Sequence, residues 1–274
     1  METIRPDGAC SPTERSALVA ALDTALRTAV GVAVLPAALI LVSLWVVLLV
    51  LVGAPNAWVD RAYTGYARFA LWVGATRVEA SGLEHIVRGQ AYVVVPNHES
   101  DWDPPVHMGT LDMLRLRAVI KEQMIRIPIF GRALLLSGNV RVERTRTPED
   151  VERIREAMAK RRPDVSMLFY AEGTRSRDGA LHDFKKGAFA TAIAYQLPVL
   201  PVGTAGTRRI WPPLTLRLRR SPVVVKVGAP IPVAGLTFAD RDRLRDDAHR
   251  AVRELRRAAR LRLRMLGVEP GGID

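Results

Sequence analysis

Cysteine is nearly absent from this chain of 274 residues, in which Cys10 is the only one. A single cysteine allows no disulfide within the chain, and such a sequence is typical of a reducing compartment. We expect Cys10 to be a free thiol in a polar N-terminal tail, residues 1–28. No group of cysteines and histidines has the spacing of a zinc site, so the sequence predicts no metal centre.

Charge is absent from residues 29–54. A helix rises about 1.5 Å per residue, so this run is long enough for a hydrocarbon core of roughly 30 Å. It begins too far into the chain, and after too acidic a tail, for a cleaved signal peptide. Residues 58–72 mix tryptophan and tyrosine with two arginines, which suits the headgroup level. We therefore expect residues 29–74 to be a membrane-embedded helix and an interfacial helix, and a single spanning helix or a helical hairpin in one leaflet both stay open.

Positive charge is plentiful in the rest of the chain. The formal net charge is +12, although residues 1–54 contain three arginines against four acidic residues. Such a surface attracts polyanions, among them nucleic acid, anionic lipid headgroups and acidic carriers. If one helix spans the membrane, the basic C-terminal portion should face the cytoplasm. The sequence thus predicts a protein of the cell membrane with its folded part on the cytoplasmic face.

The pattern from residue 75 alternates between short β-branched runs and helical stretches. We expect strands at residues 91–95, 116–120, 165–169, 199–202 and 223–227. A helix should begin at Pro148, with Thr147 as its cap, and run through Met158, and another should cover residues 186–196. This alternation predicts an α/β domain over residues 75–236, with a mixed central sheet flanked by helices.

The C-terminal segment, residues 237–274, is expected to hold one basic amphipathic helix over residues 240–265. Apolar residues recur at a spacing of three to four, and arginines occupy the other faces, at positions 241, 243, 245, 250, 253, 256, 257, 260, 262 and 264. Two interpretations stay open: a solvated face on a packed helix, or a helix that binds a membrane surface or nucleic acid. The chain has no recognised nucleic-acid motif and no regular set of stacking aromatics, so binding of nucleic acid is not expected.

The candidate catalytic residues lie in residues 97–103, directly after the run at 91–95. His98 is followed five positions later by Asp103. Histidine is suited to accept a proton near neutral pH, and a carboxylate can hold its ring in one tautomer. We expect Glu99 and Asp101 to be solvent exposed, and His85, His107, His182 and His249 to be structural or surface histidines.

Three further blocks follow along the chain. The second, residues 121–144, begins with Lys121 and ends with Arg144. The third places Glu172, Gly173, Thr174 and Arg175 at the end of an expected strand, with Lys185 in a second basic turn behind them. Ligands of α/β sheets bind at the carboxyl ends of strands, and arginine donates two hydrogen bonds to a phosphate. The fourth block, residues 198–204, is expected to be a buried strand whose tip borders the site.

The order and spacing of these four blocks resemble the sequence motifs of the glycerolipid acyltransferases, the family of 1-acylglycerol-3-phosphate acyltransferase. The resemblance covers residues 75–235. It implies transfer of a fatty acyl group from coenzyme A or acyl carrier protein to the hydroxyl of lysophosphatidic acid, which makes phosphatidic acid in phospholipid biosynthesis. The thioester is then a co-substrate, and no cofactor is expected. Anionic membrane lipids are expected partners.

The resemblance also implies residue roles. His98 is the general base that deprotonates the acceptor, and Asp103 orients it. The implied substrate-binding residues are Lys121, Arg144, Glu172, Gly173, Thr174, Arg175 and Lys185. No acyl-enzyme is required, and the chain lacks a Gly-x-Ser-x-Gly nucleophile elbow.

Three alternatives stay open. The acceptor could be glycerol 3-phosphate, another lysophospholipid, a lyso-ornithine lipid or a glycolipid. The same scaffold could serve a lipid hydrolase or remodelling protein. The third hypothesis, a membrane-anchored protein that binds nucleic acid, is supported only by the positive net charge. Acyl-chain length, the donor carrier and the oligomeric state do not follow from the sequence.

Overall fold

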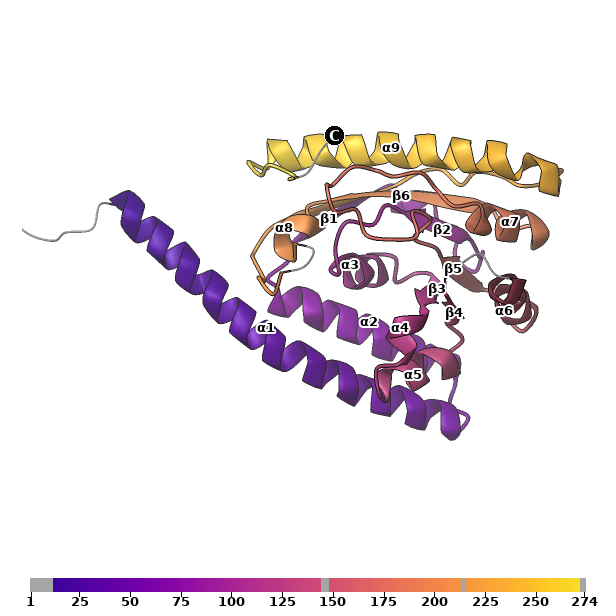
Figure 1. Ribbon diagram of the computed structural model, residues 1–274, viewed down its shortest axis with the longest axis horizontal. Coiled ribbons are helices and arrows are strands. Elements are labelled where there is room, and N and C mark those ends of the chain that lie inside the picture. Colours follow the sequence, from indigo (N-terminus) through magenta and orange to yellow (C-terminus); the bar gives the residue numbers. More distant parts are fainter. Residues whose placement is uncertain (1–11, 144–147, 213–214, 272–274) are drawn as a thin grey trace, which may run out of the picture.

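A seven-stranded sheet forms the centre of the computed structural model, which describes residues 12–143, 148–212 and 215–271 (Figure 1). The strand order is β1-β7-β6-β2-β5-β3-β4. The strands are β1 (Val78–Ser81), β2 (Val93–Pro96), β3 (Arg115–Lys121), β4 (Val140–Val142), β5 (Val165–Leu168), β6 (Val199–Ala205) and β7 (Val223–Val227). β6, β2, β5, β3 and β4 are parallel neighbours, whereas β7 is antiparallel to β6 and parallel to β1. The predicted mixed sheet is confirmed.

Helices cover both faces of this sheet (Figure 1). They are α1 (Pro12–Leu51), α2 (Asn56–Val73), α3 (Asp103–Thr110), α4 (Glu122–Ile125), α5 (Phe130–Leu136), α6 (Pro148–Ala159), α7 (Gly187–Ala194), α8 (Thr207–Ile210) and α9 (Arg241–Met265), with short 3-10 turns at Leu83–His85 and Phe238–Asp240. Val94 of β2 packs in the core beneath α2 and α3, whereas Val93 and Val95 pack beneath α7 and α9. A strand buried on both faces explains the uninterrupted apolar run that predicts it.

Each of the five predicted strands is present, with ends shifted by up to three residues. The strands β1 and β4 were not expected. Both lie at the edges of the sheet and have only four and three residues. The helix predicted from Pro148 through Met158 is α6, but its predicted cap, Thr147, lies outside the described residues.

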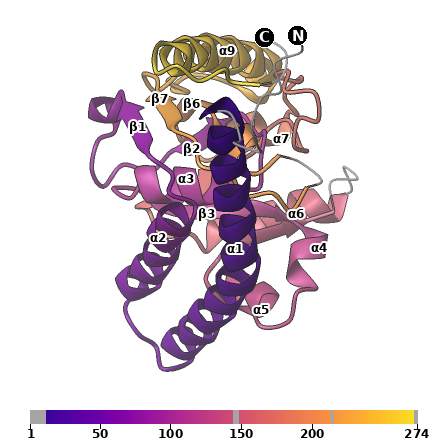
Figure 2. The same ribbon diagram turned by 90° about the vertical axis from the view of Figure 1, so that its left-hand side faces the viewer.

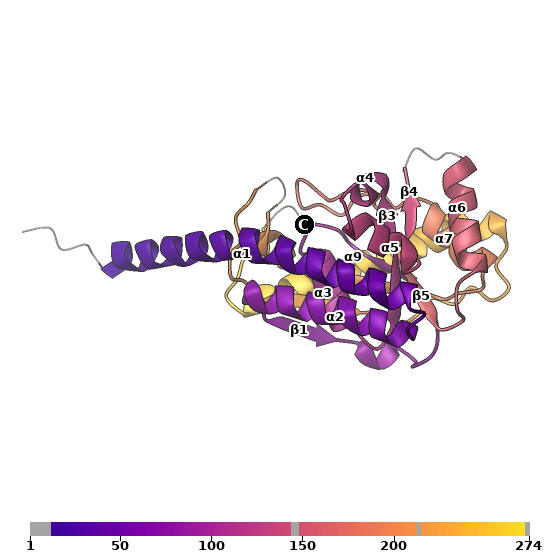
Figure 3. The same cartoon turned by 90° about the horizontal axis from the view of Figure 1, so that it is seen from below.

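The two N-terminal helices form a hairpin that packs along the domain. α1 begins at Pro12, earlier than the predicted boundary at residue 29, and continues through Pro36. Its segment Ala21–Leu51 has a mean hydropathy of 2.9 and is long and apolar enough to cross a membrane, and 22% of its most apolar part is buried. Figures 2 and 3 show α2 returning beside the second half of α1. Figures 1 and 3 show the first turns of α1 extending beyond the rest of the molecule.

The C-terminal helix α9 packs on the face of the sheet opposite α1 and α2 (Figures 1 and 2). Its predicted apolar stripe is confirmed, because Leu244, Ala248, Val252 and Leu263 are buried against the sheet and α7. The expectation that its arginines all lie on other, solvated faces is wrong for Arg256 and Arg260, which are 4% and 3% exposed. The remaining membrane-surface and nucleic-acid interpretations of this helix stay predictions.

Candidate active site

Two neighbouring parallel strands carry the candidate site at their carboxyl ends. β2 leads into the His98 loop (residues 97–102), and β5 leads into the Glu172 loop (residues 170–186). Val93 pairs with Met167 and Val94 with Leu168, so the two loops begin side by side. The backbone N–H of Ser176 donates to the carbonyl of His98 over 2.8 Å, which joins the loops directly.

The His98 ring is held by Asp103, as predicted. Nδ1 of His98 lies 2.7 Å from Oδ2 of Asp103. The same oxygen accepts the backbone N–H groups of Glu99 at 2.7 Å and Ser100 at 2.8 Å. Asp103 can donate nothing back when ionised, so Nδ1 of His98 carries the hydrogen and Nε2 is the basic nitrogen. No hydrogen bond to Nε2 occurs among the described residues.

Asp103 is suited to stay ionised. Its side chain is 1% exposed, and it opens helix α3, where the peptide dipoles favour a negative charge. Burial acts to raise the pKa of this carboxyl, but the hydrogen bond from His98 and the nearby imidazole rings hold that pKa below its ordinary value. An ionised Asp103 stabilises the imidazolium that forms when His98 takes a proton.

Tyr170 packs against the His98 ring, a contact that sequence reasoning missed. Its ring stacks on that of His98 with the centroids 3.9 Å apart. The Tyr170 hydroxyl lies 3.0 Å from Nδ1 of His107, whose Nε2 lies 2.8 Å from the Thr204 hydroxyl. Burial lowers the pKa of His107 to about 4, so this histidine is neutral near pH 7 and structural, as expected. The only sequence signal for Tyr170 is its position at the end of an apolar run.

Glu172 ties the two loops together. Its carboxylate accepts the backbone N–H of His98 at 2.7 Å through Oε1 and that of His182 at 3.0 Å through Oε2. The side chain is buried, and this burial raises its pKa to about 8 against the effect of the two N–H donors. These contacts give Glu172 a part in shaping the site, while its implied contact with a substrate stays a prediction.

Gly173 and Lys185 meet inside the Glu172 loop. Gly173 has a φ of +78°, a conformation that other residues rarely adopt. A Cβ at this position would fall 2.5 Å from Cε of Lys185. The turn therefore favours glycine here, while the exposed Lys185 side chain that crosses it could move aside for a larger residue.

Arg175 lies beside the His98 loop and is available to a ligand. It forms an ion pair with Asp101, and their side chains are 35% and 58% exposed. Asp101 is exposed as expected, although it is not unpartnered. Thr174 is also exposed.

The second block begins with Lys121 at the carboxyl ends of the strands, as the His98 loop does, but its described residues do not contact His98. Lys121 is exposed at the carboxyl end of β3, which is two strands from β2 in the sheet and hence about 10 Å away at the usual strand spacing. Arg144 lies outside the described residues. The structure thus assembles His98, Asp103, Glu172, Gly173, Arg175 and Lys185, and it leaves Lys121 as a more distant cation on the same rim.

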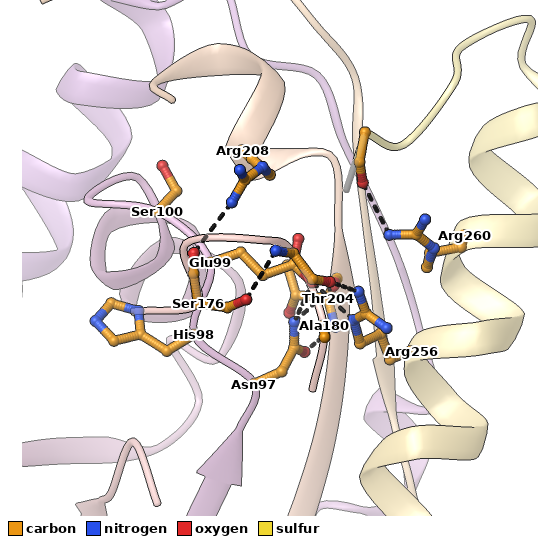
Figure 4. Close-up of polar contacts among 12 residues, drawn as sticks. Asn97, His98, Glu99, Ser100, Ser176, Ala180, Thr204, Arg208, Arg256 and Arg260 are labelled. Carbon is orange, nitrogen blue, oxygen red and sulfur yellow. Dashed lines mark hydrogen bonds and ion pairs between the residues drawn. The ribbon is translucent and has the colours of Figure 1, made fainter. Parts of the chain in front are cut away.

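The expectation that Glu99 is solvent exposed is wrong. Glu99 is 2% exposed, and its Oε1 lies 2.7 Å from Nε of Arg256 on α9 (Figure 4). The helical spacing of apolar residues in α9 predicts that Arg256 is solvated, like the other arginines of this helix. Nothing in the sequence near residue 99 or residue 256 indicates that the two side chains meet. Arg208 of α8 also joins the site, since its guanidinium donates to the carbonyls of Ser176 and Arg177.

A cavity of about 540 Å³ lies elsewhere in the described part of the chain, between α5, β4 and α6. Its lining includes Arg117, Arg153 and Met167 but neither His98 nor Asp103. Val165, at the amino end of β5, also lines it, so this cavity lies toward the amino ends of the strands and away from the candidate site. Among the described residues, no group of three or more potential metal ligands is positioned to hold an ion.

Comparison with known proteins finds a family model that matches the part of the chain containing this site. Residues 77–205 match the family model described as Acyltransferase. This range contains the His98 loop, the Glu172 loop and β6. The resemblance stated from the sequence is thus confirmed.

Relatives and a solved structure agree with that match. The chain is 31% identical over 162 residues to the 1-acyl-sn-glycerol-3-phosphate acyltransferase of Limnanthes douglasii, covering 59% of this chain and 57% of that protein. It is 31% identical over 186 residues to the alpha form of Homo sapiens, covering 65% of each. The chain therefore spans 57% and 65% of the lengths of these two relatives. The crystal structure of the 1-acyl-sn-glycerophosphate (LPA) acyltransferase PlsC from Thermotoga maritima has the same fold, with a TM-score of 0.72 and 23% identity over 86% of this chain and 97% of that one.

Proposed function

We propose that this chain, whose residues 77–205 form an acyltransferase-family domain, transfers a fatty acyl group from a thioester donor to the free hydroxyl of 1-acyl-glycerol 3-phosphate. The observation that carries the proposal is the 2.7 Å hydrogen bond between His98 and Asp103, at the carboxyl end of β2 and beside Arg175. The choice of 1-acyl-glycerol 3-phosphate as the acceptor is supported by the relatives, which are named 1-acyl-sn-glycerol-3-phosphate acyltransferases.

The reaction uses His98 twice. Nε2 takes the proton of the acceptor hydroxyl as its oxygen attacks the thioester carbonyl, and the imidazolium is stabilised by Asp103. The carbon–sulfur bond then breaks, the acyl group stays on the acceptor oxygen as an ester, and the leaving thiolate takes the proton from Nε2. No nucleophilic serine is needed in this scheme, so the acyl group passes directly from donor to acceptor.

Arg175 is the best placed cation for the acceptor phosphate. Its guanidinium can donate two parallel hydrogen bonds to phosphate oxygens, and it lies close to His98 through its ion pair with Asp101. Lys185 and Lys121 add positive charge along the same rim of the sheet. In this proposal the phosphate replaces Asp101 as the partner of Arg175 when the acceptor binds.

The donor is a thioester of coenzyme A or of acyl carrier protein, and both carriers are acidic. The net charge of +12 favours either of them. No resident cofactor enters the scheme, because the thioester supplies the reactive group.

The α1–α2 hairpin places this chemistry at a lipid surface in our proposal. Leu41, Leu44, Trp45 and Leu48 of α1 are exposed and apolar. The opposite side of α1 contacts the rest of the chain over much of its length, since the Thr28 hydroxyl accepts the backbone N–H of Leu218 and Val46 is buried near Ala133. A helix held in this way fits one leaflet of the membrane better than a lone span, with the domain on the cytoplasmic side. Replacing Leu41, Leu44 and Leu48 by Gln should reduce flotation of the full chain with lipid vesicles, and unchanged flotation would contradict this placement.

The acceptor is tested with purified full-length protein and a labelled acyl donor, either acyl-coenzyme A or acyl carrier protein. The acceptor panel holds lysophosphatidate, glycerol 3-phosphate, a second lysophospholipid and a lyso-ornithine lipid. We expect the largest kcat/KM with lysophosphatidate. Transfer to the lyso-ornithine lipid without transfer to lysophosphatidate would overturn the proposed acceptor and leave the transfer chemistry in place.

A further inference from the structure

The residue next to His98 is tied to the far end of the chain. The buried Glu99 carboxylate pairs through Oε1 with Nε of Arg256, 157 residues later, over 2.7 Å. Both side chains are buried. Figure 4 shows the His98 ring pointing away from α9 and the Glu99 side chain pointing toward it. His98 thus faces the candidate reaction site, whereas Glu99, the next residue of the same loop, faces the C-terminal helix.

Arg256 contacts more than one loop. It also donates to the carbonyl of Gly179 in the Glu172 loop. Oε1 of Glu99 receives a second hydrogen bond from Nδ2 of Asn97 at 3.2 Å. Asn97 in turn exchanges two hydrogen bonds with the backbone of Thr204 on β6, at 2.7 and 3.0 Å. The residues before and after His98 are therefore fixed to β6 and α9 through one network.

The backbone of α9 closely approaches the backbone of β6 at this same level. A Cβ on Gly203 of β6 would lie 2.3 Å from the backbone nitrogen of Arg256 and 2.4 Å from the carbonyl carbon of Leu255. The backbone of α9 thus rests on the backbone of β6 at Gly203, which fixes the height of Arg256 above the sheet. The Arg256 side chain therefore extends to Glu99 from a backbone that is held against the sheet.

On the premise that His98 is the base of the proposed acyl transfer, we propose that Arg256 is a positioning residue. Through Glu99 and Gly179 it holds the His98 loop and the Glu172 loop in one arrangement, so that the His98 ring meets the acceptor hydroxyl. α9 already has an apolar stripe that docks it on the sheet. A buried ion pair adds little net stability compared with apolar side chains of similar volume, and its value here lies in selecting a single loop conformation.

The charges around Glu99 set a distinctive pH dependence. Arg256 pairs with it directly, Arg260 adds a positive charge from further along α9 while its guanidinium donates to Gly271, and Asp103 and Glu172 add negative charge from α3 and the Glu172 loop. Without Arg256, a buried Glu99 stays neutral at low pH and can ionise only by moving the loop toward water. Loss of Arg256 should therefore impair catalysis more strongly as the pH rises.

The test compares Arg256→Met, Glu99→Gln and the double variant with wild type and with Arg260→Met as a matched control. Arg260 is an equally buried arginine of α9, but its guanidinium reaches the carbonyl of Gly271. The readouts are kcat and KM for lysophosphatidate between pH 6 and 9, the thermal midpoint, and the ¹⁵N signals of the His98 ring.

Misplacement of a catalytic group by about 1 Å costs on the order of 100-fold, so Arg256→Met should lower kcat by about that factor at pH 8, with KM within about threefold. Glu99→Gln keeps an oxygen for the Arg256 donor and should retain kcat within about fivefold. The double variant removes the buried charge, so its kcat should recover about tenfold over Arg256→Met and lose the added pH dependence, while remaining below wild type.

Wild-type kcat in Arg256→Met or in the double variant would overturn the proposal. So would an equal loss in Arg260→Met, or a loss that follows the folded fraction with no change in pH profile. If Arg256→Met does not fold, the double variant decides. An inactive wild-type enzyme would instead overturn the proposed function, and the His98 ring signals would still report whether Arg256 holds the loop.

Discussion

Replacing Asp103 by Asn tests the chemistry of the His98–Asp103 pair in detail. Oδ2 of Asp103 accepts three N–H groups, from the His98 ring, Glu99 and Ser100. An Asn side chain satisfies all three only by placing its carbonyl oxygen there, because its NH₂ group would face three donors. The substitution therefore keeps the geometry and the tautomer of His98 and removes only the negative charge.

The expected loss follows from that charge. A hydrogen bond to a charged group contributes about 1.5–3 kcal/mol, which corresponds to a decrease in kcat of roughly 10- to 150-fold. An acceptor bound through its phosphate should keep its KM. Steady-state kinetics of the full-length variant in detergent or vesicles measures both quantities.

Two results would refute this reasoning. A kcat within about threefold of wild type would mean that the Asp103 charge does not stabilise the reacting imidazolium. A loss near 10⁴-fold would mean that the Asn side chain has turned its NH₂ group toward His98 and fixed the wrong tautomer.

Three more predictions concern the Glu172 loop. Gly173→Ala should lower the unfolding free energy by about 1–2 kcal/mol, because its φ is +78° and Lys185 must move, whereas Gly187→Ala nearby should be neutral; equal thermal midpoints for the two variants would contradict this. The pKa of Glu172 is raised to about 8, so its neutral form stabilises the fold below about pH 4.5, and this contribution is lost as the pH rises toward 8. The unfolding free energy of wild type should therefore fall between these pH values more steeply than that of Glu172→Gln, by at most about 1.4 kcal/mol per pH unit. Unfolding free energies that change in parallel with pH in the two proteins would count against this prediction. Arg175→Ala should raise the KM for lysophosphatidate about tenfold with little change in kcat, whereas Asp101→Ala should not raise it, and an unchanged KM in Arg175→Ala would argue against a phosphate contact.

The parts of the fold that follow from the sequence are those with an uninterrupted physical signal. The buried strand β2 is visible because apolar side chains occupy both of its faces, and the stripe of α9 is visible because Leu244, Ala248 and Val252 recur at helical spacing. The edge strands β1 and β4 escape prediction because each is short and contains polar residues. Their pairing is decided by neighbours that are distant in sequence.

In the candidate site, too, some contacts follow from the sequence and others do not. The pairing of His98 with Asp103 follows from a local spacing, since both residues flank one turn at the start of α3. The buried Glu99–Arg256 pair does not, because it joins residues 157 positions apart whose charges both suggest exposure. Tyr170 directly follows the predicted strand at residues 165–169, and only the tertiary structure places its ring on His98.

Replacement of His98 by Ala is the most direct test of the account. General base catalysis contributes about 10²–10⁴-fold, so the variant should lose at least about 100-fold in kcat with lysophosphatidate. It should still fold and float with vesicles. The control is His85→Ala, which should retain wild-type kcat, because Nδ1 of His85 lies 3.1 Å from the carbonyl of Val227 on β7, two strands from β2 in the sheet. Acyl transfer at the wild-type rate by a folded His98→Ala variant would contradict the assignment of His98 as the base.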